Sequence, residues 1–93
     1  MEEVRCERCG GTWHSPTVFD AAVSREVASL VRERNPMAAI RRLRESTGMS
    51  FRDAKAVQLH ITREAGKCQR CGAALTGAGV VSCGKCMSLN YDW

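Results

Sequence analysis

Cys68-Gln-Arg-Cys71-Gly72 and Cys83-Gly-Lys-Cys86 are the two stretches that decide the fold of this 93-residue chain. Eleven residues separate the two Cys-x-x-Cys pairs, and this spacing is typical of one tetrahedral Zn²⁺ ion held by four thiolates. Gly72 supplies the positive φ that such a metal-binding turn needs. We therefore predict a zinc ribbon over residues 67–93, with these four cysteines as its ligands: Cys68, Cys71, Cys83 and Cys86.

The residues between and after these pairs predict the strands of the ribbon. Thr76-Gly77-Ala78-Gly79 separates Ala74-Leu75 from Val80-Val81, which predicts a two-stranded hairpin within residues 73–82. After the last cysteine, Leu89, Tyr91 and Trp93 alternate with polar residues and predict a further strand. We expect these aromatic side chains to pack on the metal site or the helices; stacking on nucleic-acid bases is the alternative.

A third cysteine pair, Cys6 and Cys9, lies in an N-terminal knuckle and supplies half of a closed zinc site. We expect His14 and His60, the two histidines of the chain, to complete a second tetrahedral site that ties the knuckle to the helices. The alternatives for the missing ligands are Asp20, water, or the same cysteine pair of a second copy. Either histidine is also compatible with an ordinary surface or hydrogen-bonded role.

Cysteine usage and composition favour a cytoplasmic zinc protein. All six cysteines fall in Cys-x-x-Cys pairs, and Met1-Glu-Glu-Val-Arg does not resemble a secretory leader, so metal-bound thiolates are favoured over a disulfide scaffold. No apolar run approaches the ~20 residues of a membrane span. The net charge of +4 permits contact with nucleic acid or an acidic protein surface and requires neither.

An enzyme is not expected. A zinc ion with an open fourth position would resemble a catalytic centre, but the chain lacks the glutamate of a His-Glu-x-x-His or His-x-Glu motif. Redox use of the N-terminal cysteine pair would need a βαβ context, which the sequence does not predict.

Apolar residues recur at helical spacing through the middle of the chain and predict a three-helix module. Ser15-Pro16-Thr17 precedes the first helix, Gly48 ends the second, and Ser50 caps the third. The predicted helices span about 17–34, 36–47 and 50–66. The predicted fold is therefore a small metal-stabilised α+β protein with a zinc knuckle (1–16), a three-helix module (17–66) and a zinc ribbon (67–93).

Residues 39–57 resemble the helix–turn–helix of the C-terminal domain of the bacterial ribosomal stalk protein. Their sequence is Ala-Ile-Arg-Arg-Leu-Arg-Glu-Ser-Thr-Gly-Met-Ser-Phe-Arg-Asp-Ala-Lys-Ala-Val. Positions that match the family pattern are Ile40-Arg41, Leu43-Arg44, Thr47-Gly48-Met49 and Phe51-Arg52-Asp53-Ala54-Lys55. Ser50 replaces a turn glycine of the family, and the cysteines at 68 and 71 leave no room for its strands. The Leu-Arg-x-x-Thr-Gly stretch is also similar to the three-helix N-terminal module of elongation factor Ts.

In the stalk-protein family this helix pair recruits translational GTPases, so the resemblance implies a protein-binding surface linked to translation. The matching positions are Arg41, Arg44 and Lys55 for its basic contacts and Ala39 and Ile40 for its apolar ones. The alternatives are a stable helical hairpin without a partner and an Arg-rich face that binds nucleic acid. Residues 32–55 hold seven Lys/Arg against three Asp/Glu, which supports a binding face of either kind.

Overall fold

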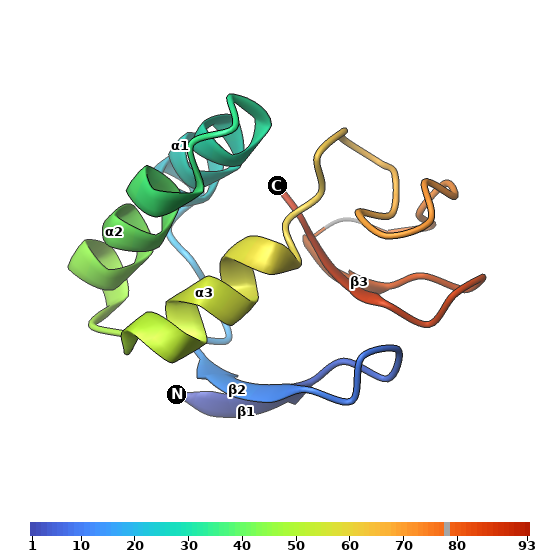
Figure 1. Cartoon of the computed structure of the whole chain (residues 1–93), viewed down its shortest axis with the longest axis horizontal. Coiled ribbons are helices and arrows are strands. Elements are labelled where there is room, and N and C mark those ends of the chain that lie inside the picture. The colour runs from blue at the N-terminus through green and yellow to red at the C-terminus, as the bar shows by residue number, and fades with distance from the viewer. Residues whose placement is uncertain (78) are drawn as a thin grey trace.

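The computed structural model describes residues 1–77 and 79–93, and these form three helices and two two-stranded sheets (Figure 1). The elements are β1 (Glu2–Arg5), β2 (Thr12–Ser15), α1 (Ala21–Arg32), α2 (Pro36–Thr47), α3 (Phe51–Leu59), β3 (Gly79–Ser82) and β4 (Leu89–Asp92). The small α+β class predicted from the sequence is confirmed. In the described part of the chain no helix is long and apolar enough to cross a bilayer.

The first helix is shorter than predicted at both ends. The Asp20 carboxylate accepts hydrogen bonds from the backbone N–H groups of Ala22 (2.9 Å) and Val23 (3.1 Å), so α1 begins after this cap and not at residue 17. Residues 12–15, which precede it, belong to β2. At the other end Arg34 adopts a left-handed conformation (φ +61°), which stops the helix after Arg32.

The second helix has the predicted bounds because local residues set both of its ends. Pro36 occupies its first position, and Gly48 closes it in a left-handed conformation with φ +74°. The Ser50 hydroxyl then accepts the Asp53 N–H at 3.1 Å and caps α3, as predicted.

The third helix ends at Leu59, seven residues before the predicted end at 66. A competing strand contact is the reason. The His60 carbonyl accepts the Tyr91 N–H at 2.8 Å, and the Thr62 N–H donates to the Tyr91 carbonyl at 3.1 Å. The chain after α3 is therefore bonded to β4, and its backbone groups are not available for another helical turn.

The strand pairing differs from the predicted hairpin. Val80 and Val81 pair in antiparallel register with Tyr91 and Asn90 of β4, not with Ala74-Leu75. Ala74 instead forms an isolated antiparallel bridge with Lys67. The C-terminal strand is confirmed, whereas Ala78 in the predicted turn lies outside the described residues. A second hairpin, β1 paired with β2, was not predicted.

One hydrophobic core joins all three predicted segments. Its most deeply buried members come from both sheets and all three helices: Trp13, Val27, Leu43, Val57 and Tyr91. The Trp13 indole N–H donates to the Tyr91 hydroxyl at 3.0 Å and so connects β2 to β4 across the core. The Phe19 ring contacts both Tyr91 and Trp93, so the C-terminal aromatic residues pack inside the protein, as expected.

Candidate metal centres

The three Cys-x-x-Cys segments fold into the same backbone turn. In each, the N–H of the first cysteine donates to the carbonyl five residues later, and its carbonyl accepts the N–H four residues later. These bonds are Cys6–Gly11 (3.0 Å) and Gly10–Cys6 (2.8 Å), Cys68–Ala73 (2.8 Å) and Gly72–Cys68 (3.0 Å), and Cys83–Ser88 (2.8 Å) and Met87–Cys83 (2.9 Å). We call these turns the first, second and third knuckles.

Each knuckle needs a left-handed residue directly after its second cysteine. Gly10 (φ +71°) and Gly72 (φ +78°) supply it in the first two knuckles, as the sequence suggested for Gly72. In the third knuckle Met87 holds the same conformation with φ +67°, although a side chain makes it unfavourable. The shared backbone therefore overrides the preference of Met87, which shows how strongly the turn is constrained.

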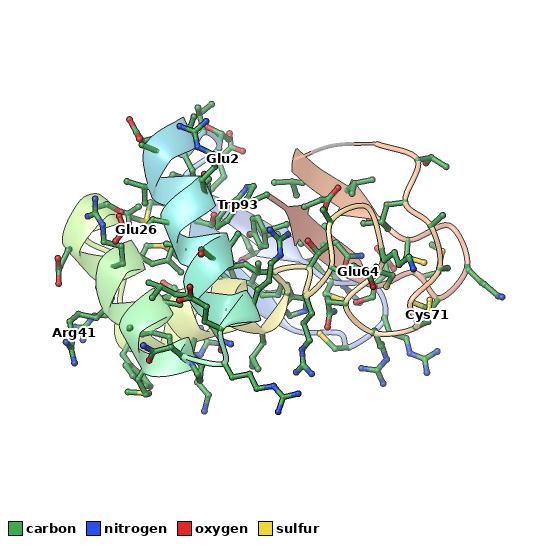
Figure 2. All side chains as sticks on the ribbon, turned by 90° about the horizontal axis from the view of Figure 1, so that it is seen from above. Glu2, Glu26, Arg41, Glu64, Cys71 and Trp93 are labelled. Carbon is green, nitrogen blue, oxygen red and sulfur yellow. The ribbon has the colours of Figure 1, made fainter. Side chains whose placement is uncertain are left out.

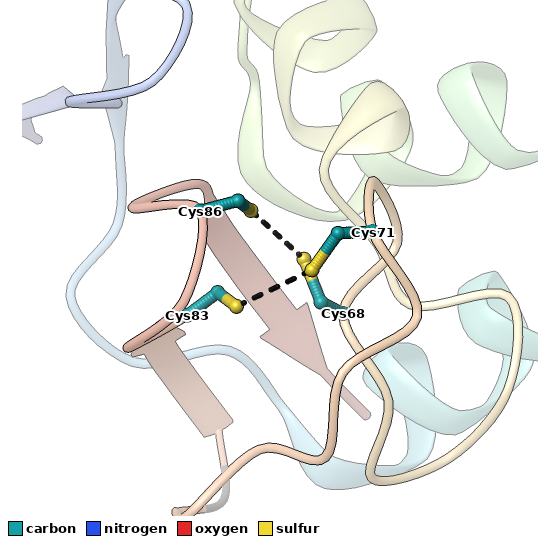
Figure 3. Close-up of side chains that lie close together, drawn as sticks. All are labelled: Cys68, Cys71, Cys83 and Cys86. Carbon is teal, nitrogen blue, oxygen red and sulfur yellow. Dashed lines mark hydrogen bonds between the residues drawn. The ribbon is translucent and has the colours of Figure 1, made fainter.

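The second and third knuckles bring four thiols into one cluster (Figure 3). All four sulfurs lie within 4.8 Å of one another, with Cys68 Sγ and Cys86 Sγ separated by 3.6 Å and Cys71 Sγ and Cys83 Sγ also by 3.6 Å. A tetrahedral zinc ion with Zn–S bonds of about 2.3 Å separates its sulfur ligands by about 3.8 Å. The cluster, which we call the four-cysteine centre, thus has the dimensions of a metal site.

The pKa values of Cys68 and Cys86 in this centre are shifted in opposite directions by their surroundings. Burial raises the pKa of Cys68, but the backbone N–H groups of Cys71 and Arg70 outweigh it and the pKa falls to about 6. The Ser88 N–H lowers the pKa of Cys86, yet burial and the three neighbouring thiols raise it to about 12. Four thiols this close cannot all ionise without a cation among them, and a divalent metal supplies that charge.

The first knuckle forms a second cluster with the end of α3. Cys6, Cys9 and His60 place their ligand atoms within 4.8 Å of one another, and Cys9 Sγ lies 3.7 Å from His60 Nε2. His60 Nδ1 lies 2.7 Å from the Ala56 carbonyl, which only accepts, so Nδ1 carries the proton and Nε2 offers its lone pair to the cluster. The Trp13 ring packs on the His60 imidazole, with the ring centroids 4.5 Å apart, and fixes the orientation of the imidazole.

Cys6 is the buried cysteine of this second cluster, which we call the Cys₂His centre. Burial raises the pKa of its thiol. The backbone N–H groups of Leu89 and Cys9 act in the opposite direction and outweigh burial, so the pKa falls to about 6. The Leu89 N–H lies 3.4 Å from Cys6 Sγ, and the Ser88 hydroxyl lies 3.9 Å from it. The site is therefore shaped as a thiolate site before any metal is considered.

The structure does not bring His14 into the Cys₂His centre. His14 is exposed on β2, and its backbone N–H donates to the Asp53 carboxylate at 3.3 Å. Asp20, the alternative ligand, caps α1 instead. The expected set of four ligands is thus reduced to three within the described chain.

The roles of Ser88, Leu89 and Asn90 beside the cysteines were not predicted from the sequence, which marked only Leu89, as part of a strand. Their one visible sign is that they lie close after the last cysteine pair. Asn90 donates from its amide to Cys68 Sγ at 3.5 Å, while its carbonyl oxygen accepts the Gln69 N–H at 2.8 Å.

The residues implied by the stalk-protein resemblance are split between core and surface. Ala39 is fully buried and Ile40 is 4 % exposed, whereas Arg41, Arg44 and Lys55 are exposed; Figure 2 shows Arg41 at the surface of the helices. A groove of about 450 Å³ lies where α2 meets the start of α3. It is lined by Met37, Ile40, Arg41, Arg44, Glu45, Gly48, Met49 and Phe51, and we call it the α2–α3 groove.

No protein-family model, curated protein sequence or solved structure matches the chain with statistical significance. Its function therefore has to be inferred from the two cysteine clusters and the α2–α3 groove themselves.

Proposed function

We propose that this protein is a non-enzymatic zinc-binding interaction module, in which two metal centres hold a helical surface that docks a protein partner. The observation that carries the proposal is the pair of cysteine clusters, joined through Leu89 and Asn90, beside a three-helix core that exposes an apolar groove. The metal supplies stability that a chain of this size lacks, and the helices supply the surface.

Zinc is the metal that fits the donor chemistry best. Four thiolates in a tetrahedral arrangement suit zinc or an iron–sulfur centre, and two thiolates with one imidazole suit zinc. A structural zinc site contributes on the order of 10 kcal/mol of apparent binding energy to folding. Native mass spectrometry tests this assignment: we expect two zinc ions per chain, one for each cluster.

The α2–α3 groove has an apolar floor and a basic rim. Ile40 and Met49 are 4 % and 3 % exposed at its base, while Met37 and Phe51 expose 58 % and 44 % of their surface beside it. Exposed apolar side chains gathered at a hollow are typical of a docking site for an amphipathic helix.

The charges at the groove favour an acidic occupant. Arg41 and Arg44 line it, against one acidic residue, Glu45. The partner we propose is therefore a protein that presents an acidic amphipathic helix. The resemblance of residues 39–57 to the stalk-protein hairpin extends this proposal to a translation-associated partner, with Arg41 and Arg44 in the same role.

A designed acidic amphipathic peptide, with leucines at helical spacing and glutamates beside them, tests the groove. We expect it to shift the backbone amide resonances of the groove residues, and we expect Arg41→Glu with Arg44→Glu to weaken its binding at least tenfold. Arg25→Glu, an exposed charge reversal on α1, is the matched control and should leave binding nearly unchanged. A peptide whose shifts avoid the groove would contradict the proposal.

A nucleic-acid-binding function is the second candidate, favoured by one feature of the knuckles. Each carries an exposed cation directly before its second cysteine: Arg8, Arg70 and Lys85. These cations also offset the negative charge of thiolate ligands, which is the simpler explanation. A labelled single-stranded oligonucleotide distinguishes the two functions. Binding that falls steeply with salt and is lost in Arg70→Glu with Lys85→Glu would favour this second function.

A further inference from the structure

We propose that the Cys₂His centre keeps one coordination position for a monodentate sulfur or nitrogen donor from outside the chain. This inference rests on the proposed zinc ion at Cys6, Cys9 and His60 and concerns the ligand that completes its tetrahedron. The four-cysteine centre, by contrast, is closed by its own residues. The two centres would then differ in kind, one structural and one able to exchange a ligand.

The ligand count is the first step. The described residues include every histidine, cysteine, aspartate and glutamate of the chain, because the one residue outside them is an alanine. Three of these groups meet at the Cys₂His centre, and among the described residues no fourth one lies within the 4.8 Å that joins them. The Ser88 hydroxyl, 3.9 Å from Cys6 Sγ, accepts a hydrogen bond from the Gln69 amide at 2.9 Å and so has another role.

The space around the centre is the second step. Cys6 and His60 are buried, whereas Cys9 is exposed, so the centre meets solvent on the Cys9 side. Two glycines follow Cys9. A Cβ atom at Gly10 would meet nothing within 4 Å, and one at Gly11 would meet only Cys9 Sγ, at 3.4 Å. The described residues therefore leave open space beside Gly10, and a glycine stands where a side chain would contact the Cys9 sulfur.

The charge of the two centres is the third step. Two thiolates and a neutral imidazole cancel the charge of a zinc ion, which leaves the Cys₂His centre neutral and still Lewis-acidic. Four thiolates give the other centre an excess of negative charge. Zinc sites in proteins are built chiefly from sulfur and nitrogen donors. A thiol or an imidazole therefore suits the remaining position. A thiol that binds releases its proton to solvent, and the ligand it replaces is water.

Cobalt substitution of the full chain tests this inference, because Co²⁺ reports its ligands in the visible spectrum. We expect two Co²⁺ per chain, and we expect imidazole and 2-mercaptoethanol each to change the spectrum of one of them. Cys9→Ser should bind one Co²⁺, keep the four-thiolate spectrum and lose the response. His14→Ala is the matched control and should keep both the second ion and the response, since His14 lies outside the cluster.

The outcomes separate the inference from the proposed function. If the wild-type chain binds a single Co²⁺, the proposed metal at the Cys₂His centre fails, and the inference fails with it. If two ions bind and neither ligand alters the spectrum at saturation, the inference alone is overturned. A response that appears in His14→Ala but not in the wild-type chain would also overturn it, because His14 would then be the fourth ligand.

Discussion

Replacing Tyr91 by phenylalanine tests whether the two cysteine-bearing ends of the chain form one folding unit. The Tyr91 hydroxyl accepts the Trp13 indole N–H at 3.0 Å, and these residues are 1 % and 2 % exposed. Phenylalanine keeps the aromatic ring against Phe19 and Trp93 but removes the acceptor. The substitution therefore removes the polar contacts of the hydroxyl and changes little of the packing.

The expected cost follows from what the substitution leaves behind. The Trp13 N–H stays buried without an acceptor, which costs about 1–3 kcal/mol in unfolding free energy. Domains of this size have only about 5–15 kcal/mol in total. A loss of 1 kcal/mol lowers the melting temperature of a small domain by about 4–8 °C, so the change is well above the error of the measurement.

Urea unfolding of the zinc-saturated protein, followed by tryptophan fluorescence, measures this cost. Trp13→Phe supplies the matched background, because Tyr91→Phe should cost much less once the indole N–H is gone. Val18→Ala, at an 83 % exposed position, controls for non-specific effects. An equal cost in both backgrounds, or a cost below about 0.5 kcal/mol, would refute the reasoning, since surface changes lie in that range.

Three further predictions concern the knuckles, the helix caps and alkaline pH. Gly72→Ala should lower the free energy of unfolding by about 1 kcal/mol, because alanine disfavours the left-handed φ of +78° at this position. Gly84→Ala has free space for the added Cβ and no such φ, so it should be neutral or slightly stabilising in the same urea experiment. Asp20→Ala should lower the free energy of unfolding by about 1 kcal/mol, because it removes the N-terminal cap of α1. Asn35→Ala should lower it little, because Asn35 makes no side-chain cap bond, and thermal melts of the two variants check both expectations. Burial raises the pKa of Tyr91. The stability that this shift contributes is complete below the unfolded-state pKa of about 10 and is lost as the pH rises through the folded-state pKa. Tyr91→Phe should flatten this alkaline decline in a pH series of unfolding experiments.

Some features set by neighbouring residues could be predicted from the sequence, although the β1–β2 hairpin and the start of α1 after Asp20 were not. The bounds of α2 follow from Pro36 at its start and Gly48 at its end, and both act within one turn of the helix. The four-cysteine cluster follows in the same way from two short turns, since each Cys-x-x-Cys segment builds its own knuckle. Its four ligands needed only the two knuckles to face each other.

Features set by distant residues could not be predicted. The end of α3 at Leu59 depends on β4, because Tyr91 bonds to the backbone on both sides of Ile61. His60 lies at that helix end, so its place in the Cys₂His centre depends on the same contact. No local pattern distinguished it from His14, which follows Cys9 more closely in sequence but lies outside the cluster.

Both candidate metal centres depend on the start of β4. Its Leu89 N–H donates to Cys6 Sγ at 3.4 Å, and the Asn90 amide donates to Cys68 Sγ at 3.5 Å. Leu89 contributes its backbone N–H and Asn90 its side-chain amide, so two consecutive residues contact one cysteine sulfur of each centre. Hydrogen bonds to charged groups are worth about 1.5–3 kcal/mol, more than neutral ones, so a metal ion that ionises the cysteines of either centre would help to hold these two residues in place for the other. The two centres therefore share the start of β4, and the four-cysteine centre is not structurally independent of the N-terminal one.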